Sequence, residues 1–188
     1  MKQRNSWCAR VACLLLLCCT VGARAETQVH EDLAYTKTRQ ATLDLYLPSA
    51  NRPPLLVFVD SRFWHARDRA RELATRFARP LQRLGVAVAV VRTRSAPAHP
   101  HPAAAQDVAR AVDFLLDRPA GEFDRERVYL AGHGSGGQLA ALVALDPRYL
   151  EAAGRAPDVL AGVAGLSGHY DLENDTGPLP PEADALFQ

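Results

Sequence analysis

The sequence predicts an α/β fold, a three-layer sandwich built on a mainly parallel sheet. Two observations favour it. Unbroken apolar runs such as "PLLVFVD" (54–60) and "VAVAVV" (86–91) are typical of strands covered on both faces. Segments with apolar residues at helical spacing separate these runs. The chain has 188 residues, 48% of them hydrophobic, which is enough for the core of one domain.

Residues 1–25 are predicted to be a signal peptide, which leaves a single domain over 26–188. Basic residues precede the apolar run 11–21, and Ala23 and Ala25 put small side chains where a signal peptidase reads them. The apolar run is shorter than the roughly 20 residues that span a bilayer. We therefore expect cleavage before Glu26, export to the periplasm or the medium, and no membrane attachment afterwards.

All four cysteines lie inside the predicted leader. The mature chain would have none, so we expect neither a disulfide nor a zinc site built from cysteines.

The first half of the domain is predicted to run strand, strand, helix, strand. Residues 33–48 end in alternating apolar and polar positions before a proline, which favours an outer antiparallel hairpin. The buried strand 54–60 follows. Apolar residues at helical spacing from 67 to 84 predict a helix that Pro80 kinks or splits. The run 86–91 is the next buried strand.

The second half continues the alternation. Three prolines between 97 and 102 predict an extended loop, and the apolar stripe from Ala104 to Leu115 predicts a helix after it. "RVYLAG" (127–132) is expected to be a third buried strand, 138–145 a helix, and "VLAGVAGLSG" (159–168) a fourth strand. Ligands of such sheets bind at the carboxyl ends of the strands.

Composition excludes several classes of partner. The net charge is +1 with no basic stripe, so no nucleic-acid partner is expected. The six histidines show no spacing typical of metal ligands, and "GHGSGG" lacks the residues of a phosphate-binding loop. We predict no metal and no cofactor.

Three stretches together resemble the α/β-hydrolase fold, in particular the esterase/lipase family with its carboxylesterases and its enzymes similar to feruloyl esterases and kynurenine formamidases. "RSAPAHPHPAAAQDVARAV" (94–112) is similar to a proline-rich segment of that family. "FVDSRFWHARD" (58–68) and "GHGSGGQLA" (132–140) resemble its oxyanion and nucleophile segments. The resemblance implies an α/β-hydrolase fold, here incomplete, and an ancestral substrate that is a small ester or amide.

The nucleophile segment departs from the family at one position. The resembling enzymes read G-H-S-A-G-G-H-L-A, so alignment without a gap puts Gly134 where they have serine. The residues two before and two after the nucleophile must be small, and Gly132 and Gly136 meet this requirement. Around Ser135 those neighbours would be His133 and Gly137. The resemblance therefore implies a lost nucleophile, with Ser135 as the only alternative.

The oxyanion segment departs as well. Asp60, Ser61 and Arg62 stand where the family has His-Gly-Gly, whose glycines let the backbone turn its N–H groups toward the oxyanion. We expect this substitution to spoil the oxyanion hole. Trp64 keeps the hydrophobic part of the segment. Trp64, His133 and His169 are our candidates for residues that line the pocket.

The triad's acid and histidine follow the nucleophile in this family, and the sequence ends about where they would begin. Three hypotheses remain open. The first is an exported homologue without esterase activity. The second is an active ester or amide hydrolase that uses Ser135, with His133 or His169 as base. The third is a binding module, with a protein partner at an exposed apolar sheet edge formed by 159–166.

Overall fold

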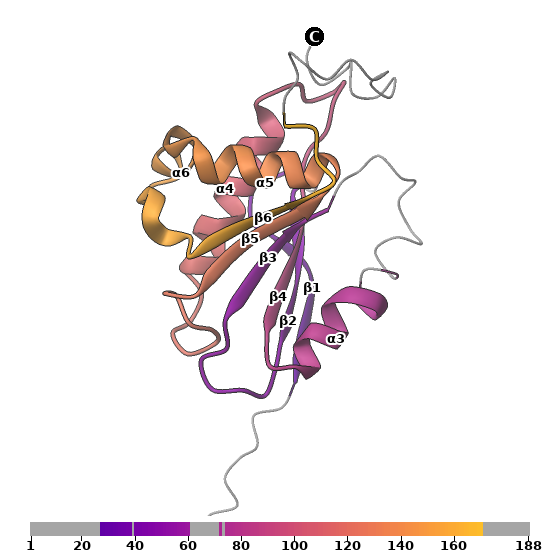
Figure 1. Cartoon of the computed structure of the whole chain (residues 1–188), viewed down its shortest axis with the longest axis vertical. Helices are drawn as coiled ribbons and strands as arrows, with labels where there is room; N and C mark the ends of the chain where they lie inside the picture. Colours follow the sequence, from indigo (N-terminus) through magenta and orange to yellow (C-terminus); the bar gives the residue numbers. More distant parts are fainter. Residues whose placement is uncertain (1–26, 39, 61–71, 73, 171–188) are drawn as a thin grey trace, which may run out of the picture.

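The computed structural model of the chain describes residues 27–38, 40–60, 72 and 74–170. The predicted signal peptide therefore lies outside the described residues. Six strands form one sheet, with helices packed on both of its faces (Figure 1). The strands are β1 (Gln28–Ala34), β2 (Thr42–Leu47), β3 (Leu55–Val59), β4 (Ala87–Arg92), β5 (Val128–His133) and β6 (Gly162–Leu166). The helices are a π-helical turn (Ala74–Ala78), α3 (Arg79–Arg83), α4 (Ala103–Leu116), α5 (Ser135–Leu145), α6 (Pro147–Ala152) and a short 3-10 turn (Pro157–Val159).

The strand order across the sheet is β1-β2-β4-β3-β5-β6. The β1–β2 and β2–β4 pairs are antiparallel, and the other three pairs are parallel. The predicted outer hairpin and the mainly parallel sheet are both confirmed. β1 starts at Gln28, five residues before the hairpin predicted from the sequence.

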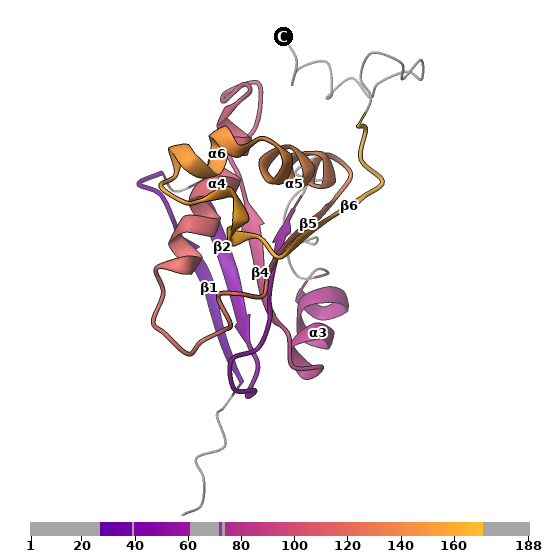
Figure 2. The same cartoon turned by 60° about the vertical axis from the view of Figure 1, so that its left-hand side comes forward.

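The layers are easiest to see in Figure 2, where α4 and α6 lie on one side of the sheet and α3 lies on the other. Side chains of β4 alternate between the two faces. Ala87, Ala89 and Val91 join the larger core under α4 and α5, whereas Val88 and Val90 join the smaller core beside α3. This two-sided burial explains why the strand reads as an unbroken apolar run.

The predicted helix 67–84 is described only from its later part. Pro80 stands in the first turn of α3, directly after the π-helical turn, so the helical path changes type at the expected place. A proline fits there because the first helical N–H groups need no partner within the helix.

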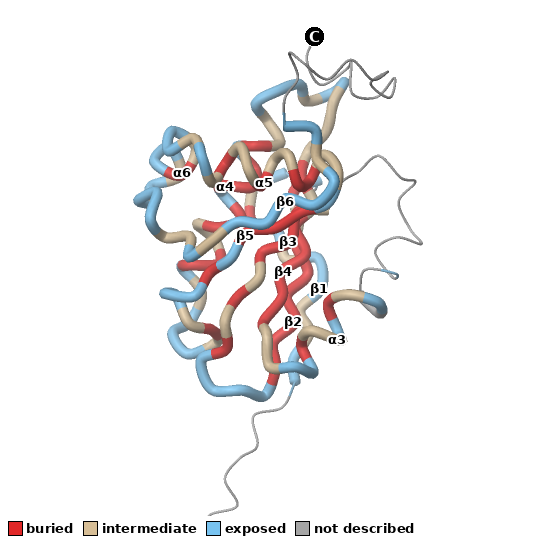
Figure 3. The backbone as a smooth tube through the Cα atoms, in the orientation of Figure 1, coloured by how far each residue is buried: buried red, intermediate tan, exposed pale blue. Residues whose placement is uncertain are grey.

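β6 lies at the exposed edge of the sheet, the position that the third hypothesis expected for 159–166. Its burial falls off along its length, whereas β3 and β4 are buried (Figure 3). Val163 is 42% exposed and Leu166 is 51% exposed. Within the described residues β6 pairs only with β5, so its outer edge is unpaired, while α5 packs against one of its faces.

α6 has no counterpart among the elements expected from the sequence. Asp146 caps its first turn, where the side chain accepts a hydrogen bond from the N–H of Arg148, and Pro147 is its first residue. No helix in the described part of the chain is long and apolar enough to cross a membrane.

Candidate active site

A single residue joins the third parallel strand to the helix that follows it. β5 ends at His133, α5 begins at Ser135, and Gly134 lies between them with φ +58° and ψ −126°. An L-residue with a side chain rarely adopts these angles, because its Cβ atom collides with the backbone. Glycine adopts them without that penalty. Gly134 is therefore the apex of a sharp turn at the carboxyl end of the sheet.

The turn is tight because the helix starts almost on top of the strand. A Cβ atom on Gly132 would lie 2.3 Å from the backbone carbonyl carbon of Gly136 and 2.7 Å from the nitrogen of Gly137. Any larger residue at 132 would push the first turn of α5 away from β5. The alignment that places Gly134 at the apex requires small residues two positions before and two positions after it. Gly132 and Gly136 meet this requirement.

Two backbone hydrogen bonds hold the apex in place. The N–H of Gly134 donates to the carbonyl oxygen of Leu166 at 2.8 Å, which ties the turn to the edge strand β6. The carbonyl oxygen of Gly134 accepts from the N–H of Gln138 at 3.1 Å and so starts the hydrogen bonding of α5.

Ser135 is the first residue of α5 and is partly buried. Among the described residues, none forms a hydrogen bond with its hydroxyl group. A serine nucleophile needs a base within hydrogen-bond reach, and the described part of the chain supplies none for Ser135. The role assigned to Gly134 stays a prediction, and this geometry supports it.

The histidines named as candidates lie at the same edge of the sheet. His133 is the last residue of β5, is exposed, and is opposite Leu166 of β6. His169 follows β6 by three residues and is also exposed. Neither residue lines the cavity that lies between α4 and α6. Trp64 lies outside the described residues.

Asp60 marks the carboxyl end of β3. It follows Val59, which is opposite Gly132, so Asp60 stands one position beyond the last paired residues of β3 and β5. Its N–H donates to the carbonyl of Val91 at 3.0 Å. A carboxylate therefore follows β3 at the first of the three positions where the resembling family has His-Gly-Gly. Ser61 and Arg62, the other two oxyanion-segment candidates, lie outside the described residues.

The loop after β4 is held by a buried carboxylate that sequence reasoning missed. Asp107 of α4 is fully buried. It accepts from the backbone N–H of Arg94 at 2.9 Å and from the Arg94 guanidinium at 2.7–3.1 Å. A charged residue on an otherwise apolar helix face was the available signal, because such a group is buried only with a partner.

A second ion cluster fastens the outer hairpin to β4. The guanidinium of Arg92 bonds both oxygens of Asp44, at 2.6 and 2.8 Å, and one oxygen of Asp32 at 2.8 Å. Burial alone would raise the pKa of Asp44. The hydrogen bonds from Arg92 and from the N–H of Asp32 outweigh this, and the pKa of Asp44 is lowered from its ordinary value. The pairing with Asp44 raises the pKa of Arg92.

No group of three or more His, Cys, Asp and Glu side chains that could hold a metal ion occurs within the ranges that the structure describes.

Comparison with known families decides the relationship. The sequence profile of the BD-FAE family matches residues 43–170, which include β2 without its first residue, β3 to β6 and the turn at Gly134. The chain belongs to the BD-FAE family. This is a family of α/β-hydrolase esterases, so the resemblance inferred from the motifs and the α/β-hydrolase fold are both confirmed.

Individual relatives agree with the family assignment. Kynurenine formamidase of Danio rerio is 30% identical over 161 residues, which cover 82% of this BD-FAE chain and 50% of the relative. The chain thus spans about half the length of that protein.

Solved structures show the same fold. A candidate thioesterase from a Silicibacter species has 29% identity and a TM-score of 0.59, covering 77% of this chain and 51% of its own. An esterase of Pyrobaculum calidifontis has 25% identity and a TM-score of 0.55, and the match covers 69% of this chain and 42% of the esterase.

Proposed function

We propose that this BD-FAE chain is a homologue of ester and amide hydrolases that has lost esterase activity. One observation carries the proposal: the residue at the apex of the turn between β5 and α5 is Gly134, which has no side chain to attack a substrate. In α/β-hydrolases the nucleophile stands on such a strained turn, where its hydroxyl is exposed above the sheet.

The adjacent serine is a poor replacement. Ser135 belongs to the first turn of α5, one residue past the apex. Because the apex and the next residue differ in backbone direction, the Ser135 hydroxyl does not take the position that an apex side chain would have. Without a hydrogen-bonded base it also keeps the low reactivity of an ordinary alcohol.

The oxyanion side of the site supports the same proposal. Attack on an ester or amide carbonyl places negative charge on its oxygen, and backbone N–H donors normally stabilise that charge. The carboxylate of Asp60 follows β3 at this edge of the sheet. Asp60, Ser61 and Arg62 replace the family's His-Gly-Gly, whose glycines let N–H groups face the oxyanion, and this substitution supports a spoiled oxyanion hole.

The ancestral substrate class is taken from the relatives. One curated relative is named a formamidase and a similar structure is named an esterase. We propose a small ester or amide as the substrate of the active ancestor. The alternative, an active hydrolase that uses Ser135, predicts that this substrate class is still turned over.

An assay of p-nitrophenyl acetate hydrolysis distinguishes the inactive homologue from an active hydrolase that uses Ser135. It compares the purified chain with a Ser135→Ala variant. We expect equal rates for both proteins, no higher than those of an unrelated protein of similar size. Loss of a triad nucleophile typically costs 10³-fold or more, so a working Ser135 would make the two rates differ by about that factor. Such a difference would refute the proposal of inactivity.

We further propose that the chain is exported after cleavage of residues 1–25. The basic residues, the apolar run 11–21 and the small residues at 23 and 25 support this.

A second candidate function is an interaction module that acts through the edge strand β6. The exposed side chains of Val163 and Leu166 favour it, because an uncovered apolar edge recruits another strand. We propose a second copy of the chain as the occupant. Two β6 strands related by a two-fold axis pair antiparallel and cover each other's apolar side chains in one closed interface.

Light scattering coupled to size-exclusion chromatography tests the second candidate. We expect a dimer for the native chain and a monomer for Val163→Lys. Leu84→Lys is the matched control, because Leu84 is also an exposed apolar residue but lies at the end of α3. A monodisperse monomer for the native chain would refute the self-pairing of β6.

A further inference from the structure

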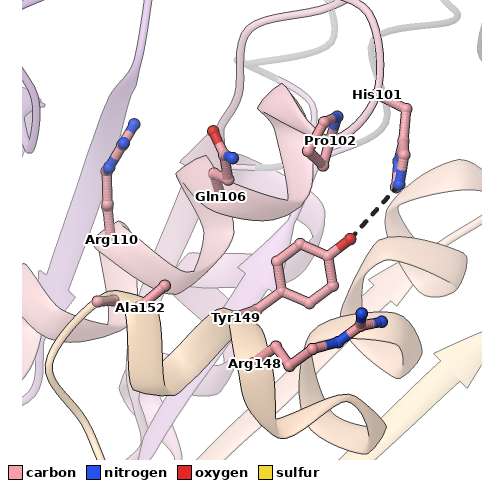
Figure 4. Close-up of a pocket in the computed structure, with 8 residues that line it drawn as sticks. His101, Pro102, Gln106, Arg110, Arg148, Tyr149 and Ala152 are labelled. Atoms are coloured by element: carbon pink, nitrogen blue, oxygen red, sulfur yellow. Dashed lines mark hydrogen bonds between the residues drawn. The ribbon is translucent and has the colours of Figure 1, made fainter.

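A cavity of about 410 Å³ lies between α4 and α6, on the helical layer rather than at the turn of Gly134. Its α4 wall is made by Pro102, Gln106 and Arg110, which recur every four residues and so share one helix face. Its α6 wall presents Tyr149 and small alanines (Figure 4). Because the alanines cannot fill the space between the helices, the groove stays open. Its volume is within the range of small-molecule sites.

The polar groups of this α4/α6 groove are mostly hydrogen-bond donors. Arg110 and Arg148 carry guanidinium groups, and Gln106 contributes an amide. The Tyr149 hydroxyl and His101 Nε2 lie 3.4 Å apart across the mouth of the groove (Figure 4). Among the residues that the structure describes, no carboxylate lines the groove. Such a lining favours an anionic ligand.

Arg110 shares its ion-pair partner, Asp107, with Arg94. Its guanidinium is 3.6 Å from the nearer oxygen of Asp107, beyond hydrogen-bond distance. Both oxygens of Asp107 are already bonded to Arg94. One carboxylate thus faces two guanidinium groups. The Arg110 side chain is 49% exposed, so its N–H groups remain accessible to a ligand.

The other charged groups near the groove are paired. Arg148 bonds both oxygens of Asp146, at 2.7 and 2.9 Å. Asp113, one turn beyond Arg110 on α4, accepts from Arg155 at 2.6 Å. These pairs leave the guanidinium of Arg110 as the group that can hold an anion by two parallel hydrogen bonds, the geometry that a carboxylate matches.

We propose that the groove between α4 and α6 binds a small carboxylate that bears an apolar body. The carboxylate is held by Arg110 and Gln106. The apolar body lies against Pro102, Ala152 and Ala153 at the floor of the groove. This site is separate from the turn at Gly134 and does not depend on whether the chain hydrolyses esters.

The test uses benzoate as the probe, with benzamide as a neutral molecule of the same shape and inorganic phosphate as a second anion. Titrations followed by amide chemical shifts report on Gln106, Tyr149 and Ala152 directly. We expect saturable binding of benzoate. Binding of benzamide and of phosphate should be weaker by about tenfold or more, because each lacks either the charge or the planar carboxylate with its apolar ring.

Variants assign the binding to this groove. Arg110→Gln removes the guanidinium charge but keeps a polar side chain, and should weaken benzoate binding by about tenfold. Arg83→Gln removes an exposed charge from α3, on the opposite face of the sheet, and should leave binding unchanged. Ala152→Leu fills the groove and should abolish binding without touching Arg110.

Absence of saturation with benzoate would overturn the proposal. So would equal affinity of the native chain and Arg110→Gln, or equal affinity for benzoate and phosphate. Circular dichroism of each variant shows whether the fold is kept, and Ala152→Leu decides the matter if Arg110→Gln does not fold.

Discussion

Gly132 and Gly136 approach each other so closely that a Cβ atom on Gly132 would lie 2.3 Å from the backbone carbonyl of Gly136. The contact joins the end of β5 to the first turn of α5 and gives the turn at Gly134 its shape. Because both partners are backbone atoms, no side-chain rearrangement can relieve a larger residue at position 132.

Gly132→Ala is therefore expected to lower the free energy of unfolding by more than about 3 kcal/mol, beyond the usual cost of overpacking. Gly162→Ala is the matched control in the neighbouring strand. Its Cβ would lie 3.3 Å from the ring of Tyr129, a partly exposed side chain that can move. Urea unfolding measures the free energy of unfolding of both variants. An equal loss of free energy in the two variants would contradict the close packing described for Gly132.

Gly134→Ser restores a hydroxyl at the apex. We expect it to cost about 1–3 kcal/mol of stability, because serine must adopt the positive φ of the apex. We also expect almost no gain in hydrolysis of an activated ester, since the described residues supply neither an aligned base nor an intact oxyanion segment. Thermal unfolding and a p-nitrophenyl acetate assay measure the two effects. A large gain in rate would show that only the nucleophile was missing.

Asp44→Asn tests the ion cluster at β1, β2 and β4. It leaves the largely buried guanidinium of Arg92 with Asp32 as its remaining carboxylate partner, so we expect a loss of up to about 3–5 kcal/mol, the cost of removing one partner of a buried pair. Asp158→Asn is the control, because Asp158 is exposed and has no ion pair or hydrogen bond from its side chain among the described residues.

The cost of Asp44→Asn should depend on pH. The folded pKa of Asp44 is below its unfolded value, so the carboxylate stabilises the fold fully above the ordinary range near about pH 4. That stabilisation is lost as the pH falls through the lowered pKa. The difference between the native chain and Asp44→Asn should therefore shrink in acid. A difference that is the same at low and neutral pH would contradict the charge pairing.

Export predicts a mature chain that begins at Glu26. Mass spectrometry of the protein recovered from a bacterial periplasm should give an amino terminus at that residue. An Ala25→Arg variant should keep the leader, because signal peptidase reads a small residue there. An intact Met1 on the exported native chain would refute cleavage.

The sequence was most informative where one local rule decided the outcome. β3, β4 and β5 were predicted because strands buried on both faces must be apolar throughout. The turn at Gly134 could be located because only small residues fit two positions on either side of it.

Prediction failed where tertiary neighbours decide. The apolar run of β6 alone does not distinguish a buried strand from an edge strand, and its edge position was expected only from the strand order of the resembling family. The pairs Arg94–Asp107 and Arg92–Asp44 join residues 13 and 48 positions apart, and nothing local to either residue names its partner. The start of α6 could have been predicted from the sequence, because Asp146 followed by Pro147 is a typical helix start.

The central claim is that no activated serine stands at the turn between β5 and α5. A fluorophosphonate probe followed by peptide mass spectrometry tests it most directly, because such probes label only activated serine nucleophiles. We predict no labelled peptide spanning Ser135 after incubation of the folded chain. Stoichiometric labelling of Ser135 that disappears on denaturation would contradict the account.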